Sequence, residues 1–209
     1  RENTMDLHVW LAYVATAIVF SLAPGSGTVN SISNGLSYGT RKSLAAIAGL
    51  QVGLACHIVL VGAGIGALVA KSALAFTVIK WVGAVYLIWL GIQKWREPPL
   101  VMGAADDTGR SASKRFWEAA FVNVINSKTT VFLLAFLPQF LNPSAPKGEQ
   151  FLIMGSVLVA VDTMVMLGYA SLAASLKGWF QNPARQKAQN RLFGGMFVAA
   201  GSALASYSR

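Results

Sequence analysis

Three ionisable residues, His57, Lys128 and Asp162, occur within long apolar stretches of this chain. A charged side chain in the hydrocarbon core of a bilayer costs several kcal/mol unless it is neutralised, paired or hydrated. We therefore interpret Asp162 as a functional residue, the alternative being a structural hydrogen bond between helices. His57 suits a proton relay because imidazole titrates near neutral pH, or it bonds a neighbouring backbone group. Lys128 is a functional cation or extends its stem toward the membrane surface.

Two polar interruptions accompany these residues. Pro24-Gly25 ends the first apolar stretch, and Asn126-Ser127-Lys128 divides a later one. Proline removes a backbone donor and glycine tolerates unusual dihedral angles, so the first helix is expected to break or kink here. The polar residues that follow, including Ser26 and Asn30, need a cavity, protein partners or a place outside the bilayer. A re-entrant segment and a kinked span both satisfy this pattern.

This combination of residues suits an amino acid, which carries both charges. The N-termini of broken helices, together with Lys128, can hold a carboxylate. Asp162 can hold the ammonium group or carry a coupling proton. The substrate-binding or coupling residues predicted from this pattern are Pro24, Gly25, Ser26, Asn30, His57, Asn123, Asn126, Lys128 and Asp162. No catalytic residue, metal site or cofactor is predicted.

The composition places the chain among membrane proteins. Of 209 residues, 55% are hydrophobic and 12% charged, whereas soluble domains are about 25% charged. The mean hydropathy is +0.53. The net charge is +9, and the basic residues lie between apolar stretches, as residues beside a membrane surface do. This distribution argues against a nucleic-acid partner. The single cysteine, Cys56, is expected to be a small buried hydrophobic residue.

The elements that must position the site are helices. We predict an all-α, multi-pass membrane protein with six transmembrane helices, over residues 7–23, 44–70, 73–95, 116–141, 151–176 and 192–207. Residues 1–4 precede Met5 and are set aside as an upstream extension, and no removable signal peptide is expected. One side of the predicted topology carries 11 Lys and Arg residues and the other carries 4, which places both termini outside the cytoplasm.

Two inverted three-helix repeats with interrupted first helices explain this layout best. A single transmembrane domain, residues 1–209, divides into repeat one (5–95), a loop (96–118) and repeat two (119–209). His57 follows Pro24 by 33 positions and Asp162 follows Ser127 by 35, so we expect both to face one cavity. Gly49 and Gly53 share a face with His57 and are predicted to serve helix packing. A homo-oligomer is compatible with such faces.

Four stretches carry a resemblance to a known family: LAPGSGTVNSISNGLSYGTRKSLAAIAGLQVGLACHIVLVG, KWVGAVYLIWLGIQKWR, FVNVINSKTTVFLLAFLPQF and VDTMVMLGYA. The chain resembles the LysE/RhtB family of bacterial amino-acid exporters, and within it the homoserine/homoserine lactone branch. The resemblance implies a six-span inner-membrane exporter driven by the proton gradient. The family's Pro-Gly-Pro is Pro24-Gly25-Ser26 here, and its Asn-Pro-Lys is Asn126-Ser127-Lys128. The resemblance adds Tyr169 beside Asp162 to the predicted site.

The sequence thus predicts a transporter and not an enzyme. It would exchange protons for homoserine, homoserine lactone or threonine across the bacterial inner membrane. Alternatives are export of basic or sulfur-containing amino acids, an intramembrane hydrolase using His57 and Asp162, or a scaffold that transports nothing. No serine lies in a nucleophile motif beside a matched base, which argues against the hydrolase.

Overall fold

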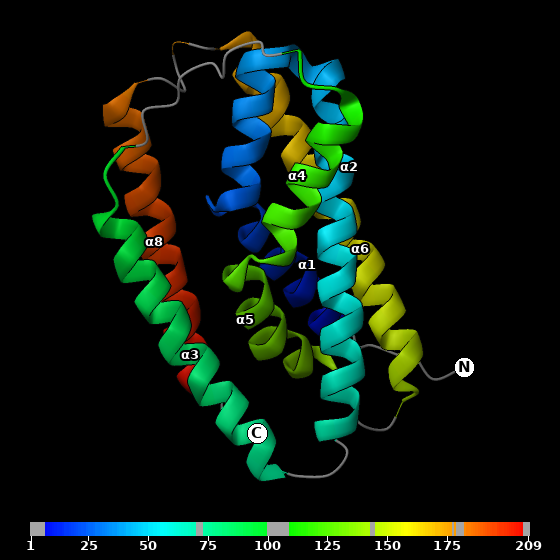
Figure 1. The fold of residues 1–209 in the computed structure, drawn as a ribbon. Coiled ribbons are helices and arrows are strands. Elements are labelled where there is room, and N and C mark those ends of the chain that lie inside the picture. The colour runs from blue at the N-terminus through cyan, green and yellow to red at the C-terminus, as the bar shows by residue number, and fades with distance from the viewer. Residues whose placement is uncertain are drawn as a thin grey trace.

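The computed structural model describes residues 7–69, 73–99, 109–142, 145–176, 178 and 182–206. The described elements are α1 (Leu7–Leu22), α2 (Ser26–Val69), α3 (Ala73–Arg96), α4 (Ala112–Val124), α5 (Ser127–Phe136), the 3-10 helix η1 (Leu137–Phe140), α6 (Lys147–Ser175) and α8 (Pro183–Ser206). They form one elongated bundle (Figure 1). The all-helical prediction is confirmed for the described residues. The predictions for residues 1–4, and for most of the loop after α3, lie outside the described residues.

Helix α2 consists of two helices that run in opposite directions and meet at Gly39. Gly39 has φ 74° and ψ 171°, a conformation that glycine adopts without steric cost. A Cβ on Gly35, before this kink, would lie 2.3 Å from the carbonyl oxygen of Ala170. After the kink the chain runs back along α6, so that Gly62 packs against Phe151. The polar run after Pro24 is therefore helical, and the helix predicted from residue 44 already begins at the kink.

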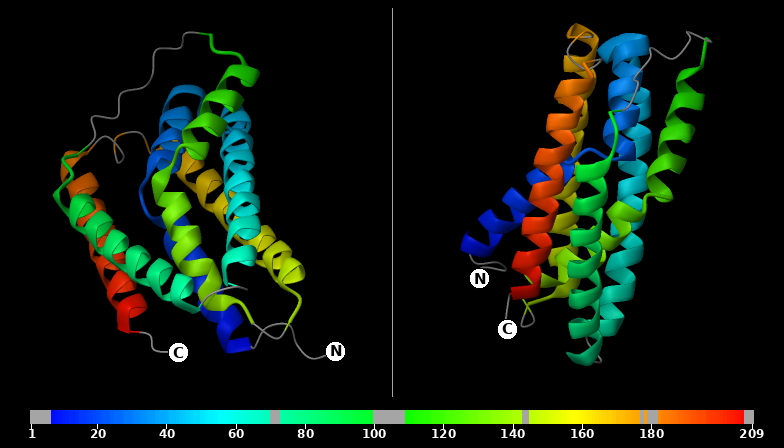
Figure 2. Two further views of the ribbon diagram at one scale, coloured as in Figure 1. Left: turned by 60° about the horizontal axis from the view of Figure 1, so that its bottom comes forward. Right: turned by 90° about the vertical axis from the view of Figure 1, so that its left-hand side faces the viewer.

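Two broken helices meet in the middle of the bundle (Figure 2). The first is α1 followed by residues 26–38, and the second is α4 followed by α5, which are bent by 51°. Helix α5 begins without a proline because the Asn126 side chain accepts a hydrogen bond from the Lys128 backbone N–H at 3.1 Å. The break predicted at residues 126–128 thus lies at the junction of α4 and α5.

Close backbone contacts hold the bundle together. Helix α2 packs against α4 and α6, and α3 packs against α8. A Cβ on Gly49 would lie 2.0 Å from the Phe116 carbonyl oxygen, and one on Gly53 would lie 2.8 Å from that of Ala120. These glycines let α2 and α4 approach within backbone contact.

Large apolar side chains cover the outside of the bundle. Leu60, Leu152 and Leu192 are 69%, 73% and 63% exposed, as expected for a surface that faces lipid. By length and composition, two described helices can cross a membrane, residues 26–64 and α6, and the bent pair of α4 with residues 127–140 makes a third. Cys56 is exposed beside Val52 and Leu60, so its predicted burial is wrong. On α2 it points about 100° away from the neighbouring, buried His57.

Two polar connections are shorter than predicted. Helix α4 begins at Ala112 because Ser111 accepts a hydrogen bond from the Lys114 backbone N–H, so the loop predicted to residue 118 ends earlier. Helix α8 begins at Pro183, nine positions before the predicted residue 192. The Asn182 side chain accepts from two backbone N–H groups there, and proline suits a first helical position.

The kink of α2 and the starts of α4 and α8 lie at one end of the bundle (Figures 1 and 2). These segments carry Arg41, Lys42, Arg110, Lys114, Arg115, Arg185, Lys187 and Arg191. The starts of α1 and α6 lie toward the other end. The bundle therefore has a strongly cationic end, which we call the basic end.

Candidate functional site

The two helix breaks are joined by Lys128. Its Nζ donates to the carbonyl oxygens of Ala23, at 3.0 Å, and Phe20, at 3.4 Å. Pro24 has no N–H, so the Phe20 carbonyl has no partner at the usual position in its helix. A cation at the carbonyl end of a helix is also favoured by the helix dipole. Gly25 leaves room for the amine, because a Cβ there would lie 3.0 Å from Nζ.

Aromatic rings cover the same amine. The Lys128 Nζ lies 4.6 Å from the Phe20 ring centroid and 5.9 Å from that of Phe197. Phe20 stacks on Phe132, with 4.0 Å between the ring centroids, and Phe132 stacks on Phe136, with 4.7 Å between theirs. These three stacked rings, Phe20, Phe132 and Phe136, are called the aromatic stack below. Cation–π contact adds to the two carbonyl bonds in stabilising the lysine away from water.

Lys128 and Asp162 line one small cavity, called the inner cavity, of about 20 Å³. Its lining includes Gly27, Thr28, Asn123, Asn126 and Thr129. This volume admits about one water molecule and no amino acid. The buried Asp162 accepts a hydrogen bond from Gln51 Nε2 at 2.9 Å. In the described part of the chain, Lys128 and Asp162 do not form an ion pair within 4.0 Å.

His57 lies beside the inner cavity and not on its lining. Its Nε2 is 2.9 Å from the carbonyl oxygen of Asn123, and its Nδ1 is 3.3 Å from Thr130 Oγ1. Asn123 in turn donates from Nδ2 to the Leu50 carbonyl oxygen at 2.5 Å. The expected arrangement of His57 and Asp162 across one cavity is therefore not found. His57 pins α2 to the α4–α5 junction, because that junction exposes a backbone carbonyl.

Tyr169 holds the end of α1 from another direction. Its hydroxyl donates to the Leu22 carbonyl oxygen at 2.7 Å and accepts from Gln189 Nε2 at 3.4 Å. Leu22 ends α1, where carbonyls have no partners within the helix. Tyr169 and Lys128 thus both bind carbonyls that the Pro24 break frees.

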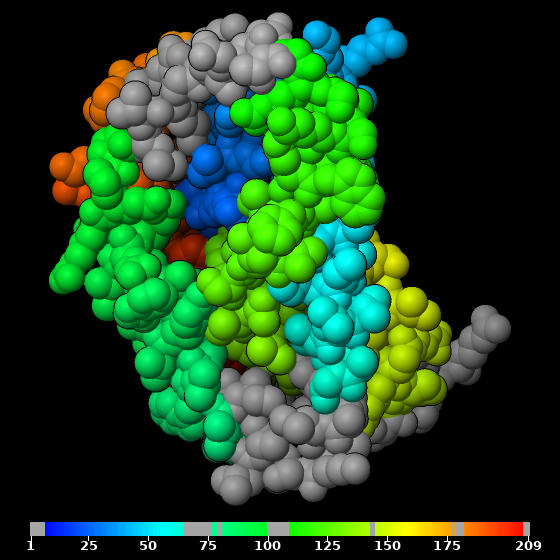
Figure 3. All heavy atoms as spheres, viewed as in Figure 1, coloured from blue at the N-terminus to red at the C-terminus, as the bar shows by residue number. Residues whose placement is uncertain are grey.

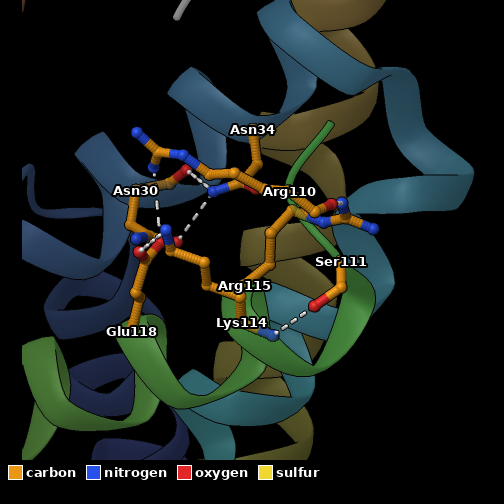
Figure 4. Close-up of polar contacts among 7 residues, drawn as sticks. All are labelled: Asn30, Asn34, Arg110, Ser111, Lys114, Arg115 and Glu118. Carbon is orange, nitrogen blue, oxygen red and sulfur yellow. Dashed lines mark hydrogen bonds and ion pairs between the residues drawn. The ribbon is translucent and has the colours of Figure 1, made fainter. Parts of the chain in front are cut away.

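Ser26 and Asn30 line a different, wider cavity of about 350 Å³, called the vestibule. It lies between the first part of α2 and α4, toward the basic end, and its lining is Ser26, Val29, Asn30, Ser33, Asn34, Tyr38, Arg110, Arg115, Glu118 and Val122. Figure 4 shows the α2 amides facing the charged side chains of α4. Six of the predicted site residues are therefore divided between these two cavities, and Pro24, Gly25, His57 and Tyr169 lie on the lining of neither.

A third cavity, of about 730 Å³, lies beyond the aromatic stack. Apolar side chains of α1, α5 and α8 dominate its lining, which also includes His8, Thr16 and Gln139. Phe20 lines both this cavity and the inner cavity. The aromatic stack therefore separates the two spaces.

Comparisons with known proteins identify the family of the chain. Residues 18–208 match the family described as LysE type translocator. The chain belongs to the LysE family. It is 57% identical to an "Uncharacterized membrane protein" of Vibrio cholerae, over 97% of this chain and 98% of that one. The "Homoserine/homoserine lactone efflux protein" of Salmonella typhimurium is 45% identical with the same coverage. A "Leucine efflux protein" of Enterobacter is 29% identical over 96% of each chain. No solved structure matches.

Two vestibule residues of this LysE-family chain, Arg115 and Glu118, were not predicted from sequence. Arg115 falls in the polar loop predicted after the third helix, and Glu118 lies where that loop overlaps the start of the predicted fourth helix. The signal was present, because Arg115, Glu118 and Val122 are spaced by three and four positions, as on one helical face. Ser111, the residue that caps α4, would have located the start of this helix.

Proposed function

We propose that this LysE-family chain exports small neutral amino acids or their derivatives, such as homoserine, homoserine lactone or threonine, across the bacterial inner membrane by proton antiport. The family match and the relatives named for homoserine and leucine efflux support amino-acid efflux. The observation that carries the proposal is that a lysine and an aspartate line one cavity where two broken helices meet. Helix breaks and intramembrane charges at one place are typical of transporter sites.

The proposed architecture is six membrane-crossing segments in two inverted repeats. Each half has a broken helix, a long helix and a third helix. In the second half the broken helix is α4 with α5, the long helix is α6 and the third helix is α8. In the first half the broken helix is α1 with residues 26–38, the long helix is residues 40–69 and the third helix is α3. The third helices, α3 and α8, each have 24 residues and pack against one another, as an axis between the halves requires. The long helices, α2 and α6, also pack together.

In the proposed site the substrate is held by its two charged groups. Lys128, with the N-terminus of α5, takes the carboxylate, and Asp162 takes the ammonium group or the coupling proton. To do so, Lys128 exchanges its bond to the Ala23 carbonyl for one to the substrate. Because the inner cavity holds about one water, the broken helices must part to admit substrate.

The cavities on either side of the inner cavity fit a path through the bundle. The vestibule lies toward the basic end, which the positive-inside rule places in the cytoplasm. The aromatic stack closes the opposite side. Alternating access then means opening toward the vestibule in one state and past the aromatic stack in the other. Asp162 would take up a proton on the outer side and release that proton inside, which would couple the two movements to the proton gradient.

Efflux from loaded cells tests the proposal. Cells that express the chain are loaded with labelled homoserine, threonine, leucine, lysine or cysteine, and release is followed with and without a proton uncoupler. We expect homoserine release to depend on the chain and to stop with the uncoupler. Uncoupler-insensitive release would contradict proton antiport. Release of leucine, lysine or cysteine in preference to homoserine would contradict the substrate class.

A further inference from the structure

We infer that the vestibule is a second substrate site, which binds the amino acid as a zwitterion from the cytoplasm before it reaches the inner cavity. This inference rests on the proposed export function and extends it. The vestibule has about 350 Å³, within the range of small-molecule sites. In Figure 3 the blue segment that includes the start of α2 lies at the bottom of a recess beside the bright green α4.

The vestibule contains buried polar atoms that lack a partner in the described residues. Arg115 is 8% exposed, and its Nε has no hydrogen-bond partner there. Asn34 Oδ1 and Tyr38 Oη, which belong to two other lining residues, are also buried without one. A buried polar group without a partner costs about 1–3 kcal/mol. All three side chains line the vestibule, so small side-chain rotations would let a polar ligand bond to these atoms and recover part of that cost.

Arg115 is held ready to receive a carboxylate. Its guanidinium lies over the Tyr38 ring, with Cζ 4.9 Å from the centroid. One of its terminal nitrogens donates to the Arg110 carbonyl oxygen. These two contacts orient the planar group and leave other N–H groups free for an anion. Arginine binds carboxylates through such paired donors, and a fixed guanidinium loses little entropy on binding.

The same cavity offers an anionic partner for an ammonium group. Glu118 follows Arg115 by one turn on α4, and its carboxylate contacts Arg110 Nη1 at 3.3 Å and Lys114 Nζ at 4.0 Å. Its side chain is 43% exposed, so it can exchange a partner without a large desolvation cost. Asn30 and Asn34, facing it from α2, are joined by a 3.1 Å hydrogen bond and can bind a polar side chain. Both charges of an amino acid thus have counterparts within one cavity.

The first turns of α2 separate the vestibule from the inner cavity. Ser26, Val29, Asn30 and Ser33 face the vestibule, with the spacing of one helical face, whereas Gly27 and Thr28 face the inner cavity. On α4 the vestibule is lined by Arg115, Glu118 and Val122, and the next residue, Asn123, lines the inner cavity. A rotation of the segment after Pro24 would therefore transfer a bound amino acid from one cavity to the other.

The test measures homoserine efflux as a function of internal homoserine concentration in cells, together with equilibrium binding of labelled homoserine to the purified full chain. The variants are Arg115→Gln and, because Arg115 also supports the start of α4, Val29→Trp, which fills the vestibule from α2 without removing a charge. The matched control is Lys42→Gln, since Lys42 is an exposed cation at the basic end and is not part of the vestibule lining.

We expect Arg115→Gln and Val29→Trp to raise the half-saturating internal concentration at least tenfold, while the maximal rate stays within about threefold. Lys42→Gln should change neither value more than twofold. If the wild type exports homoserine and both variants keep its half-saturating internal concentration, the vestibule site is overturned and the export function stands. Equal weakening by Lys42→Gln would also overturn it, since charge at the basic end would then explain the effect. Absence of efflux and binding of homoserine by the wild type would instead overturn the proposed function, and the inference with it.

Discussion

The Lys128 Nζ lies 3.0 Å from the carbonyl oxygen of Ala23, 105 positions earlier in the chain. This bond joins the break after α1 to the break between α4 and α5. It satisfies carbonyls that Pro24 leaves without partners in their helix. The same amine is the cation that we assign to the substrate carboxylate. A group that both closes the site and binds substrate makes closure depend on whether substrate is present.

Removing this amine should loosen the closed arrangement and stop transport. In Lys128→Ala, the Phe20 carbonyl loses its side-chain donor and the Ala23 carbonyl is left with the 3.4 Å bond from Thr28 Oγ1, which costs about 1–3 kcal/mol. We expect the thermal unfolding temperature in detergent to fall by several degrees and homoserine efflux to be lost. Lys42→Ala, which removes an exposed cation at the basic end, is the control. Wild-type efflux by a well-expressed Lys128→Ala would remove the lysine from the site.

Asp162→Asn should abolish gradient-driven efflux while the protein still reaches the membrane. Asparagine keeps the volume and still accepts the bond from Gln51, so packing at the inner cavity survives. It cannot release a proton, so coupling to the gradient is lost. The measurement is uncoupler-sensitive efflux together with protein quantity in the membrane fraction. Glu149→Gln, an exposed carboxylate on the same helix, should leave both unchanged. Uncoupler-sensitive efflux at the wild-type rate would exclude Asp162 as the coupling group.

The sequence allowed the helices, the two breaks and the burial of Asp162 to be predicted, because proline, amide caps and an acid among apolar residues have local meaning. It did not reveal that Lys128 bonds the Ala23 carbonyl, since 105 positions separate them. Nor did it reveal the vestibule, because Arg115 appears in the sequence as one of several cations beside a membrane. His57 illustrates the same limit. Its buried position on a glycine-lined face was predictable, but its partner, the Asn123 carbonyl, depends on how two helices cross.

His57 should affect stability more than coupling. Both ring nitrogens have partners near the α4–α5 junction, and neither contacts the inner cavity. Replacing it in His57→Phe keeps a ring but removes both hydrogen bonds, leaving the Asn123 carbonyl without that partner. We expect a lower unfolding temperature and an unchanged dependence of efflux on pH in the protein that remains folded. A shifted pH profile with unaltered stability would instead assign His57 to proton transfer.

Backbone contact between α2 and α4 should make Gly49 intolerant of any side chain. The Cβ added by Gly49→Ala would lie 2.0 Å from the Phe116 carbonyl oxygen, so the two helices must separate. Overpacking of this kind costs about 1–3 kcal/mol, and the displaced α4 carries Asn123 and Arg115 with it. The unfolding temperature in detergent should therefore be lower than that of the wild type, and homoserine efflux should fall at least tenfold. Gly64→Ala on the same helix is the matched control, since a Cβ there meets nothing within 4 Å. Because alanine favours helix by about 1 kcal/mol over glycine, Gly64→Ala should be as stable as the wild type or more so. Equal stability of the two variants would show that α2 and α4 do not rely on this close approach.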